Sequence, residues 1–233
     1  MLFLGFGSGL PYILLISTST AWLRDVNVDL SYIGFFTWIT FTYTFKFAWA
    51  PLVDRFSIPF LAQYGHRKSW IAFMQILIFL SLLFISNIDP IENFILFCIV
   101  GATIAFAGSI QDIAIDAFRI EYAHISDQGN LAASYQLGYR LAIIAATSIA
   151  LIFADINGWS MTFKLMAGLM CLGMLGVIFS KEEKNKELGK LNFINSIVEP
   201  LKDFFSRFGM FMASILLLII ATYRLTDIVM GPM

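Results

Sequence analysis

Charged side chains are scarce in this sequence. They make up 13% of its 233 residues, whereas a soluble globular domain carries about 25%. Hydrophobic residues make up 59% of the chain, and its mean hydropathy is +0.80. This composition excludes an ordinary soluble domain and predicts an integral membrane protein, for which the lipid bilayer is the first expected partner.

Cysteine is rare as well. Both cysteines, Cys98 and Cys171, lie inside apolar runs, which argues against a disulfide framework and against a zinc site. We therefore expect neither a metal nor a cofactor. Basic residues never gather on a domain outside the apolar runs, so nucleic acid is not an expected partner.

Seven stretches are long and apolar enough to cross a bilayer, which requires about 20 residues. They cover roughly residues 2–23, 31–53, 69–87, 93–118, 131–154, 160–179 and 209–230. The predicted fold is therefore an all-α membrane protein. Six helices would form one bundle over residues 1–179, and residues 209–233 would be the first helix of a truncated second bundle.

The distribution of lysine and arginine predicts how the chain crosses the membrane. The loops after the first, third and fifth spans hold only Arg24. The loops after the second, fourth and sixth spans hold Arg55, Arg67, Lys68, Arg119, Lys181, Lys184, Lys186, Lys190, Lys202 and Arg207. Since positive residues favour the cytoplasmic side, we expect the amino end to be cytoplasmic and Met233 to lie outside.

Residues 180–208 are predicted to form a cytoplasmic linker between two bundles. The first part, from Lys181 to Glu187, has the charge pattern of a solvated segment. The second part carries apolar residues at helical spacing, which fits either an interfacial helix or a plain helical linker. Six spans, a long cytoplasmic connection and a further span are the layout of a transporter built from two halves.

Two carboxylates interrupt the fourth apolar run. Asp112 and Asp116 are four residues apart, and Arg119 follows three residues later, so all three project from one side of a helix. Charge at membrane depth costs on the order of a few kcal/mol per residue and is usually turned inward for a function. The pair fits proton coupling or substrate binding, and also a static charge network joining the second, fourth and fifth spans.

Two basic residues also lie at membrane depth. Lys46, near the middle of the second span, requires a carboxylate partner, a water-filled cavity or an anionic substrate, unless it snorkels on the lipid face. Arg140 lies about ten residues into the fifth span. Its guanidinium is suited to bind a substrate carboxylate through two parallel hydrogen bonds, or to pair with Asp112 or Asp116.

Other polar and small residues in the spans allow more than one interpretation. In the seventh span, Arg224 and Asp227 either pair with each other or face a central cavity. Span 1 combines Gly5, Gly7 and Gly9 with Pro11, which predicts close helix approach and bending. Three tyrosines at membrane depth fit sugar contacts or ordinary packing: Tyr43, Tyr135 and Tyr139.

Six short segments, taken together in their order and spacing, carry a family resemblance. They are Leu4–Pro11, Ile33–Phe36, Phe45–Arg55, Gly65–Trp70, Gln111–Phe118 and Leu137–Leu141. These segments resemble the major facilitator superfamily, and within it the AmpG-type muropeptide permeases. The likeness covers the first five spans and extends more weakly through the sixth. Members of that family have at least twelve spans, whereas this chain has seven.

The resemblance implies a proton-coupled importer of anhydro-muropeptides in the bacterial inner membrane, which uses the proton rather than a cofactor and binds a small anionic solute. An acetyl-CoA-transporter-like or other facilitator permease is the alternative. The resemblance also implies that the loop after the second span latches the outward-facing state. Its motif residues are Asp54, Arg55, Gly65, Arg67 and Lys68, although positive-inside anchoring explains Arg67 and Lys68 equally well.

Three other interpretations concern the size and class of the protein. A single bundle requires a second chain or a second copy to close a cavity, or else the chain is an inactive remnant. A seven-span receptor places its amino end outside, which conflicts with the predicted orientation. None of the sequence motifs Gly-x-Ser-x-Gly, His-Glu-x-x-His or Gly-x-Gly-Asp occurs in a span, so an intramembrane enzyme is not expected.

Overall fold

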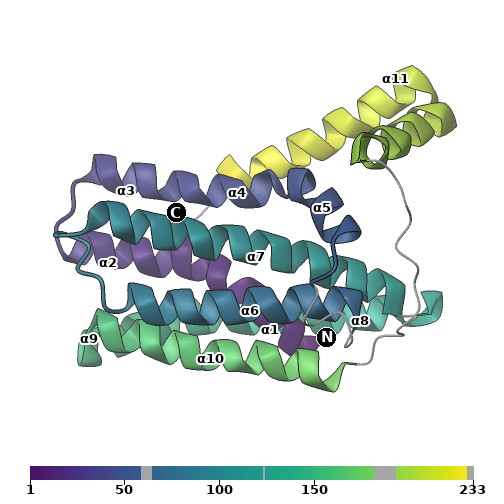
Figure 1. Cartoon of the computed structure of the whole chain (residues 1–233). Coiled ribbons are helices and arrows are strands. Elements are labelled where there is room, and N and C mark those ends of the chain that lie inside the picture. The colour runs from purple at the N-terminus through teal and green to yellow at the C-terminus, as the bar shows by residue number, and fades with distance from the viewer. Residues whose placement is uncertain (59–64, 123, 181–192, 230–233) are drawn as a thin grey trace. The chain divides into compact units, whose positions relative to one another are not determined.

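The computed structural model describes residues 1–58, 65–122, 124–180 and 193–229, and these residues form helices and connecting turns without any strand. The contacts within the chain divide it into two units, Met1–Glu187 and Leu188–Met233. The helices of the first unit run alongside one another as a bundle (Figure 1). Each unit is described by itself.

Five helices among the described residues are long and apolar enough to cross a membrane. The first is built from α1 (Leu2–Ile13), a π-helical turn (Leu14–Thr18) and α2 (Ser19–Asp25), and the next two are α6 (His66–Ile85) and α7 (Phe94–Tyr122). The fourth is built from α8 (Gln128–Ile144), a π-helical turn (Ala145–Ile149) and α9 (Ala150–Asn157), and the fifth is α10 (Trp159–Phe179). The first, third, fourth, fifth and sixth predicted spans are thus confirmed within a few residues, and the chain is a multi-pass membrane protein.

The second predicted span is helical but irregular. It is divided into α3 (Leu30–Thr37), a 3₁₀ turn (Trp38–Thr40), α4 (Phe41–Thr44) and α5 (Lys46–Arg55). The hydroxyls of Thr37, Thr40 and Thr42 each donate to a carbonyl three residues earlier, at 2.7 Å. Such bonds compete with the regular helical ladder, and here they coincide with the tightened turns before Lys46.

The packing of the first unit repeats itself in its two halves. Helix α1 packs against α8 and α10, while α7 packs against α4, α5 and α6, and α6 and α10 contact each other. Helices α1 and α7 therefore occupy equivalent positions, and each packs against two other spans. This arrangement agrees with the internal repeats that are common in transporter folds.

Helices α1 and α8 approach each other closely because both carry glycine at the contact. A Cβ on Gly5 would overlap the backbone carbonyl of Tyr135, and a Cβ on Gly138 would overlap that of Leu2. Further along, the π-helical turns of these two spans meet, where the Thr18 hydroxyl donates to the Ala146 carbonyl. The close approach predicted for span 1 is confirmed, and it fixes the residues that α1 presents to α8.

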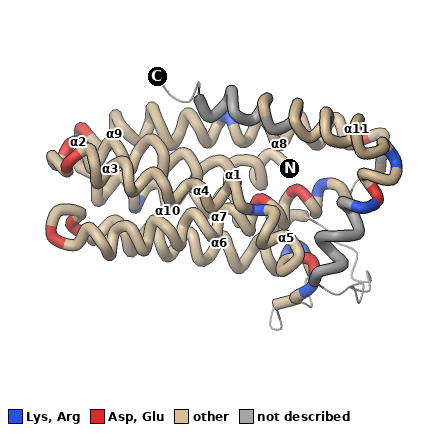
Figure 2. The backbone as a smooth tube through the Cα atoms, turned by 90° about the horizontal axis from the view of Figure 1, so that it is seen from above, with Lys and Arg blue, Asp and Glu red and all other residues tan. Residues whose placement is uncertain are grey.

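Charged residues of the first unit gather at the ends of its helices, with long uncharged stretches between them (Figure 2). This distribution is expected for helices whose middle parts lie in hydrocarbon. The few charges that lie between the helix ends are consequently the candidates for function.

The second unit contains α11 (Phe193–Val229), which is interrupted at Gly209, where φ is 71°. This left-handed conformation is readily adopted by glycine because it has no Cβ. The interruption coincides with the predicted start of the seventh span. The charged part of the predicted linker, at 181–192, and the chain end at Met233 lie outside the described residues, as do the side chains of Arg224 and Asp227.

Candidate functional site

Asp112 on α7 contacts α1 and, through it, α8. The Ser8 hydroxyl donates to Asp112 Oδ1 at 2.5 Å, and the Ser8 oxygen also lies 2.7 Å from the hydroxyl of Tyr135. Ser8 is buried at the α1–α8 contact. One carboxylate, one aliphatic hydroxyl and one phenol from three helices therefore form a hydrogen-bonded triad.

Asp116, one turn further along α7, is the centre of a group of charges. Its carboxylate lies 3.7 Å from Lys46 Nζ on α5 and 3.5 Å from Arg119 Nη2. The guanidinium of Arg119 in turn lies 5.6 Å from the centre of the Tyr135 ring, a geometry in which a cation is attracted to an aromatic face. The charged group and the triad thus meet at Tyr135 and form one continuous site.

Two side chains of this site are partly exposed. The side chains of Lys46 and Asp116 are 44% and 39% exposed, which is unusual for an ion pair at membrane depth. The exposure leaves room for an anionic molecule to approach Lys46 and Arg119. Lys46 and Arg119 are the cations of the site that can attract such a molecule, most strongly when Asp112 is protonated.

The structure shows which of the predicted residues contact each other. Lys46 pairs with Asp116, while Asp112 bonds to Ser8, a partner that the sequence analysis did not name. Tyr135, for which the sequence allowed sugar contacts or ordinary packing, bonds to the same Ser8. Arg140 is exposed on α8 and makes no ion pair with either aspartate among the described residues, so its binding of a solute carboxylate stays a prediction.

A second cluster of charges lies at the predicted cytoplasmic end of the bundle. The buried Arg67, at the start of α6, donates to Asp54 of α5 at 2.6 Å and to Glu121 of α7 at 3.0 Å. Arg67 and Asp54 belong to the predicted loop motif, whereas Glu121 was not predicted, because residue 121 falls beyond the predicted end of the fourth span. One guanidinium therefore joins three consecutive spans.

The remaining loop-motif residues support this end of the bundle. Gly65 precedes α6 with φ of 118°, in the region that favours glycine. Lys68 Nζ donates to the Ser180 carbonyl at 2.7 Å, which ties α6 to the end of α10. The exposed Arg55 lies 5.9 Å from the centre of the Phe56 ring. The latch role of the motif itself stays a prediction.

Replacing Arg67 by methionine should destabilise the bundle by about 2 kcal/mol. The loss is smaller than the 3–5 kcal/mol typical of fully buried pairs, because the Asp54 side chain is 55% exposed and water screens it. Unfolding of the purified chain in detergent would measure the difference. The control is Arg55→Met at the exposed neighbouring arginine, for which we expect a change within about 0.5 kcal/mol. Equal stability of the two variants would refute the structural role of Arg67.

Two buried glutamines lie behind the site. Gln75 on α6 and Gln111 on α7 are fully buried, and their amide groups have no hydrogen-bond partner among the described residues. Both amide nitrogens border Gly7 of α1, where Gly173 of α10 also comes close. The crossing point of four helices is therefore polar, which the sequence pattern did not indicate.

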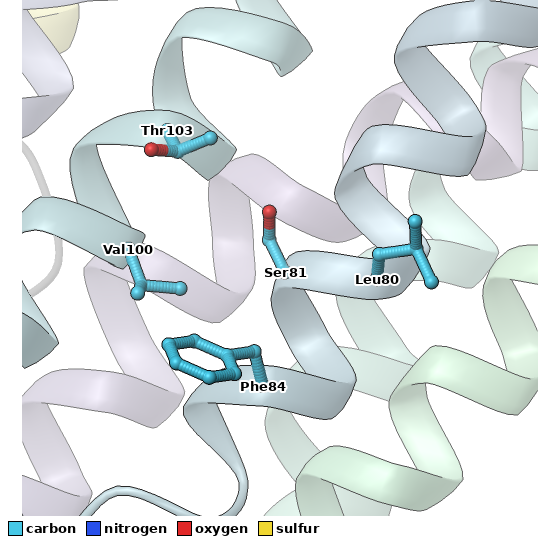
Figure 3. A pocket seen from close by; sticks show the side chains of 5 residues that line it. All are labelled: Leu80, Ser81, Phe84, Val100 and Thr103. Atoms are coloured by element: carbon cyan, nitrogen blue, oxygen red, sulfur yellow. The ribbon is translucent and has the colours of Figure 1, made fainter.

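A groove between α6 and α7 has a volume of about 390 Å³ and is lined by Leu80, Ser81, Phe84, Val100 and Thr103 (Figure 3). It carries no charged side chain. Thr103 precedes Asp112 by nine residues, which is roughly 14 Å along a helix. The groove is thus separate from the charged site. Among the described residues, no group of three or more His, Cys, Asp or Glu side chains could hold a metal ion.

A bundle of apolar helices with paired charges at membrane depth is typical of helical membrane transport proteins. The comparison with known families specifies this class further. Residues 1–230 match the family model described as Major Facilitator Superfamily. The chain belongs to that superfamily.

Similar curated proteins bear transporter names. The chain is 34% identical to the anhydromuropeptide permease of Escherichia coli K12 over 228 residues, which cover 97% of this chain and 45% of that protein. It is 33% identical to the Rickettsia conorii transporter named AmpG 4 over 235 residues, which cover 98% of this chain and 56% of the relative. The chain therefore spans about half the length of these relatives.

Proposed function

We propose that the chain forms the amino-terminal half of a proton-coupled permease of the AmpG type, which imports anhydromuropeptides across the bacterial inner membrane. The observation that carries this proposal is the continuous site of Asp112, Ser8, Tyr135, Asp116 and Lys46 within the bundle. The name and similarity of the Escherichia coli permease supply the solute class. Transport rather than catalysis is the proposed activity.

The positive part of the site suits the solute. A muropeptide carries carboxylates on its peptide, and Lys46 and Arg119 are the cations that flank Asp116. A solute carboxylate that enters between them would compete with Asp116 for the same partners. Arg140, exposed on α8, is the proposed second anchor, because a guanidinium binds carboxylates in a bidentate manner.

The proton is the proposed coupling ion, and Asp112 is its proposed carrier. A carboxylate that moves between a poorly hydrated environment and a hydrated one takes up and releases a proton. In a rocking transporter, that change of environment accompanies the switch between inward- and outward-facing states. No cofactor takes part in the proposed cycle.

A second bundle is the proposed partner of the first unit. Large apolar side chains are exposed along the second span of this chain, and they include Phe35, Trp38, Phe41, Phe45 and Phe47. In a two-halved transporter, part of this surface would face the opposite bundle and the rest would face lipid. The half-length match to the relatives agrees with this proposal.

Uptake of labelled anhydromuropeptide tests the proposal. The assay uses Escherichia coli cells that lack their own permease and produce the chain together with the carboxy-terminal half of that permease. We expect uptake that depends on the proton gradient. Lys46→Gln removes one charge-assisted contact worth about 1.5–3 kcal/mol, so solute binding should weaken roughly 10- to 100-fold.

The matched control is Lys164→Gln, at an exposed lysine of α10 outside the site, for which uptake should be unchanged. Uptake that is absent under all conditions would contradict the proposed function. Uptake that is equally affected by both lysine variants would contradict the role of Lys46.

A further inference from the structure

The Ser8 hydroxyl lies between two groups on different helices. Its oxygen is 2.5 Å from Asp112 Oδ1 on α7 and 2.7 Å from the Tyr135 hydroxyl on α8. A hydroxyl carries one hydrogen and two lone pairs. The direction of both hydrogen bonds can therefore reverse when Asp112 takes up a proton.

The two protonation states of Asp112 give two arrangements. An ionised carboxylate only accepts, so Ser8 donates its hydrogen to Asp112 and Tyr135 donates its hydrogen to Ser8. When Asp112 takes up a proton from water, its carboxyl group donates to Ser8 and Ser8 donates to Tyr135. The hydrogen of Tyr135 is then free to reach another acceptor. The new O–H bond of Asp112 is the only covalent change.

We propose that Ser8 couples the protonation of Asp112 to the binding of a solute oxygen by Tyr135. This inference rests on the proposed function and adds a residue that links the proton to the solute. Tyr135 is suitably placed, since its ring lies 5.6 Å from the Arg119 guanidinium. Protonation of Asp112 thus provides an extra donor beside a cation, where a carboxylate or sugar hydroxyl of the solute would bind.

The consequence is reciprocal coupling. If the protonated chain binds the solute more tightly, the solute-bound chain holds the proton more tightly by the same factor. A transporter with this property is mostly either empty or loaded with both proton and solute when it switches between its inward- and outward-facing states. Cotransport requires this pairing of the two ligands. Ser8 acts as a positioning residue in this scheme, because it contacts Asp112 and Tyr135 and need not contact the solute.

Other ionisable groups surround the triad on each neighbouring helix. They are Tyr12 of α1, Tyr43 of α4, Lys46 of α5, Asp116 and Arg119 of α7, and Tyr139 of α8. Lys46 is engaged by Asp116, at 3.7 Å. The described hydrogen bonds that join Asp112 to Tyr135 run through Ser8, so the coupling can be interrupted by one substitution.

Infrared difference spectroscopy of the purified chain in lipid, recorded during a pH titration, tests this inference without requiring transport. Protonation of Asp112 should produce a carboxylic C=O band that is absent in Asp112→Asn. A tyrosine C–O–H band should change at the same pH and should be absent in Tyr135→Phe. In Ser8→Ala, we expect the carboxylic band to persist and the accompanying tyrosine change to be lost completely.

The matched control is Ser109→Ala, which removes a buried hydroxyl of α7 that donates to the Phe106 carbonyl. Both bands should be retained in this variant. The inference is overturned if the tyrosine change survives in Ser8→Ala, or if no band of the unmodified chain depends on Asp112. Since the spectra report on the chain itself, a failure of muropeptide uptake would refute the proposed function and leave this result standing.

Discussion

Replacing Asp112 by asparagine should reduce uptake driven by a pH gradient to background while leaving solute exchange across the membrane intact. Asparagine has the size of the protonated aspartic acid and, like it, can donate a hydrogen bond to Ser8. Asparagine cannot bind and release a proton, so the pH gradient cannot drive uptake through residue 112. The measurement is uptake of labelled solute with an imposed pH gradient, compared with exchange of labelled for unlabelled solute without a gradient.

The control for this prediction is Asp116→Asn, one helical turn away on α7. Asp116 contacts Lys46 and Arg119 rather than Ser8, so its replacement should alter solute affinity while uptake still responds to pH. Gradient-driven uptake that survives in Asp112→Asn would contradict the assignment of Asp112 as the proton carrier. Loss of exchange as well as uptake would indicate that Asp112 is required for solute binding or folding.

The membrane-spanning helices were the part of the fold that the sequence predicted best. A transmembrane helix has to be apolar along its whole length, so length and composition suffice to find it. The second span was predicted as one helix, and the structure divides it before Lys46. Threonine hydroxyls bond to carbonyls three residues earlier at this place, but the sequence alone does not reveal which threonines bond in this way.

The candidate site could be predicted only in part. Charge at membrane depth identifies Asp112, Asp116 and Lys46 because such residues are costly in lipid. Which of them touch depends on how each helix is rotated within the bundle, and composition says nothing about that rotation. Ser8 lies 104 residues from Asp112 in the chain, and a serine in a helix carries no signal that distinguishes a partner from packing.

Helix α7 connects the two charged clusters of the bundle. Asp112 belongs to the triad, and Glu121, nine residues later on the same helix, binds Arg67. These residues are separated by roughly 14 Å of regular helix. A displacement of α7 that accompanies a change at Asp112 would therefore also act on the Arg67 contacts. Helix α7 thus connects the proposed proton site with the loop motif.

The close contact between α1 and α8 should contribute to the stability of the bundle. Gly138→Ala should destabilise the bundle by about 3 kcal/mol, at the upper end of the usual range for overpacking. The added Cβ would overlap the backbone carbonyl of Leu2, and a backbone cannot change rotamer to avoid it. The midpoint of thermal unfolding in detergent should fall accordingly.

Gly168→Ala in α10 is the matched control, because a Cβ at Gly168 meets nothing within 4 Å. Alanine favours the helix over glycine there, so this variant should gain up to about 1 kcal/mol. The opposite signs of the two stability changes distinguish the cost of the overlap between helices from the effect of helix propensity. Separation of α1 from α8 by Gly138→Ala should also lengthen the bond between Ser8 and Tyr135, so the tyrosine band should stop following Asp112. A Gly138→Ala variant as stable as Gly168→Ala would mean that the two helices are not held at this distance.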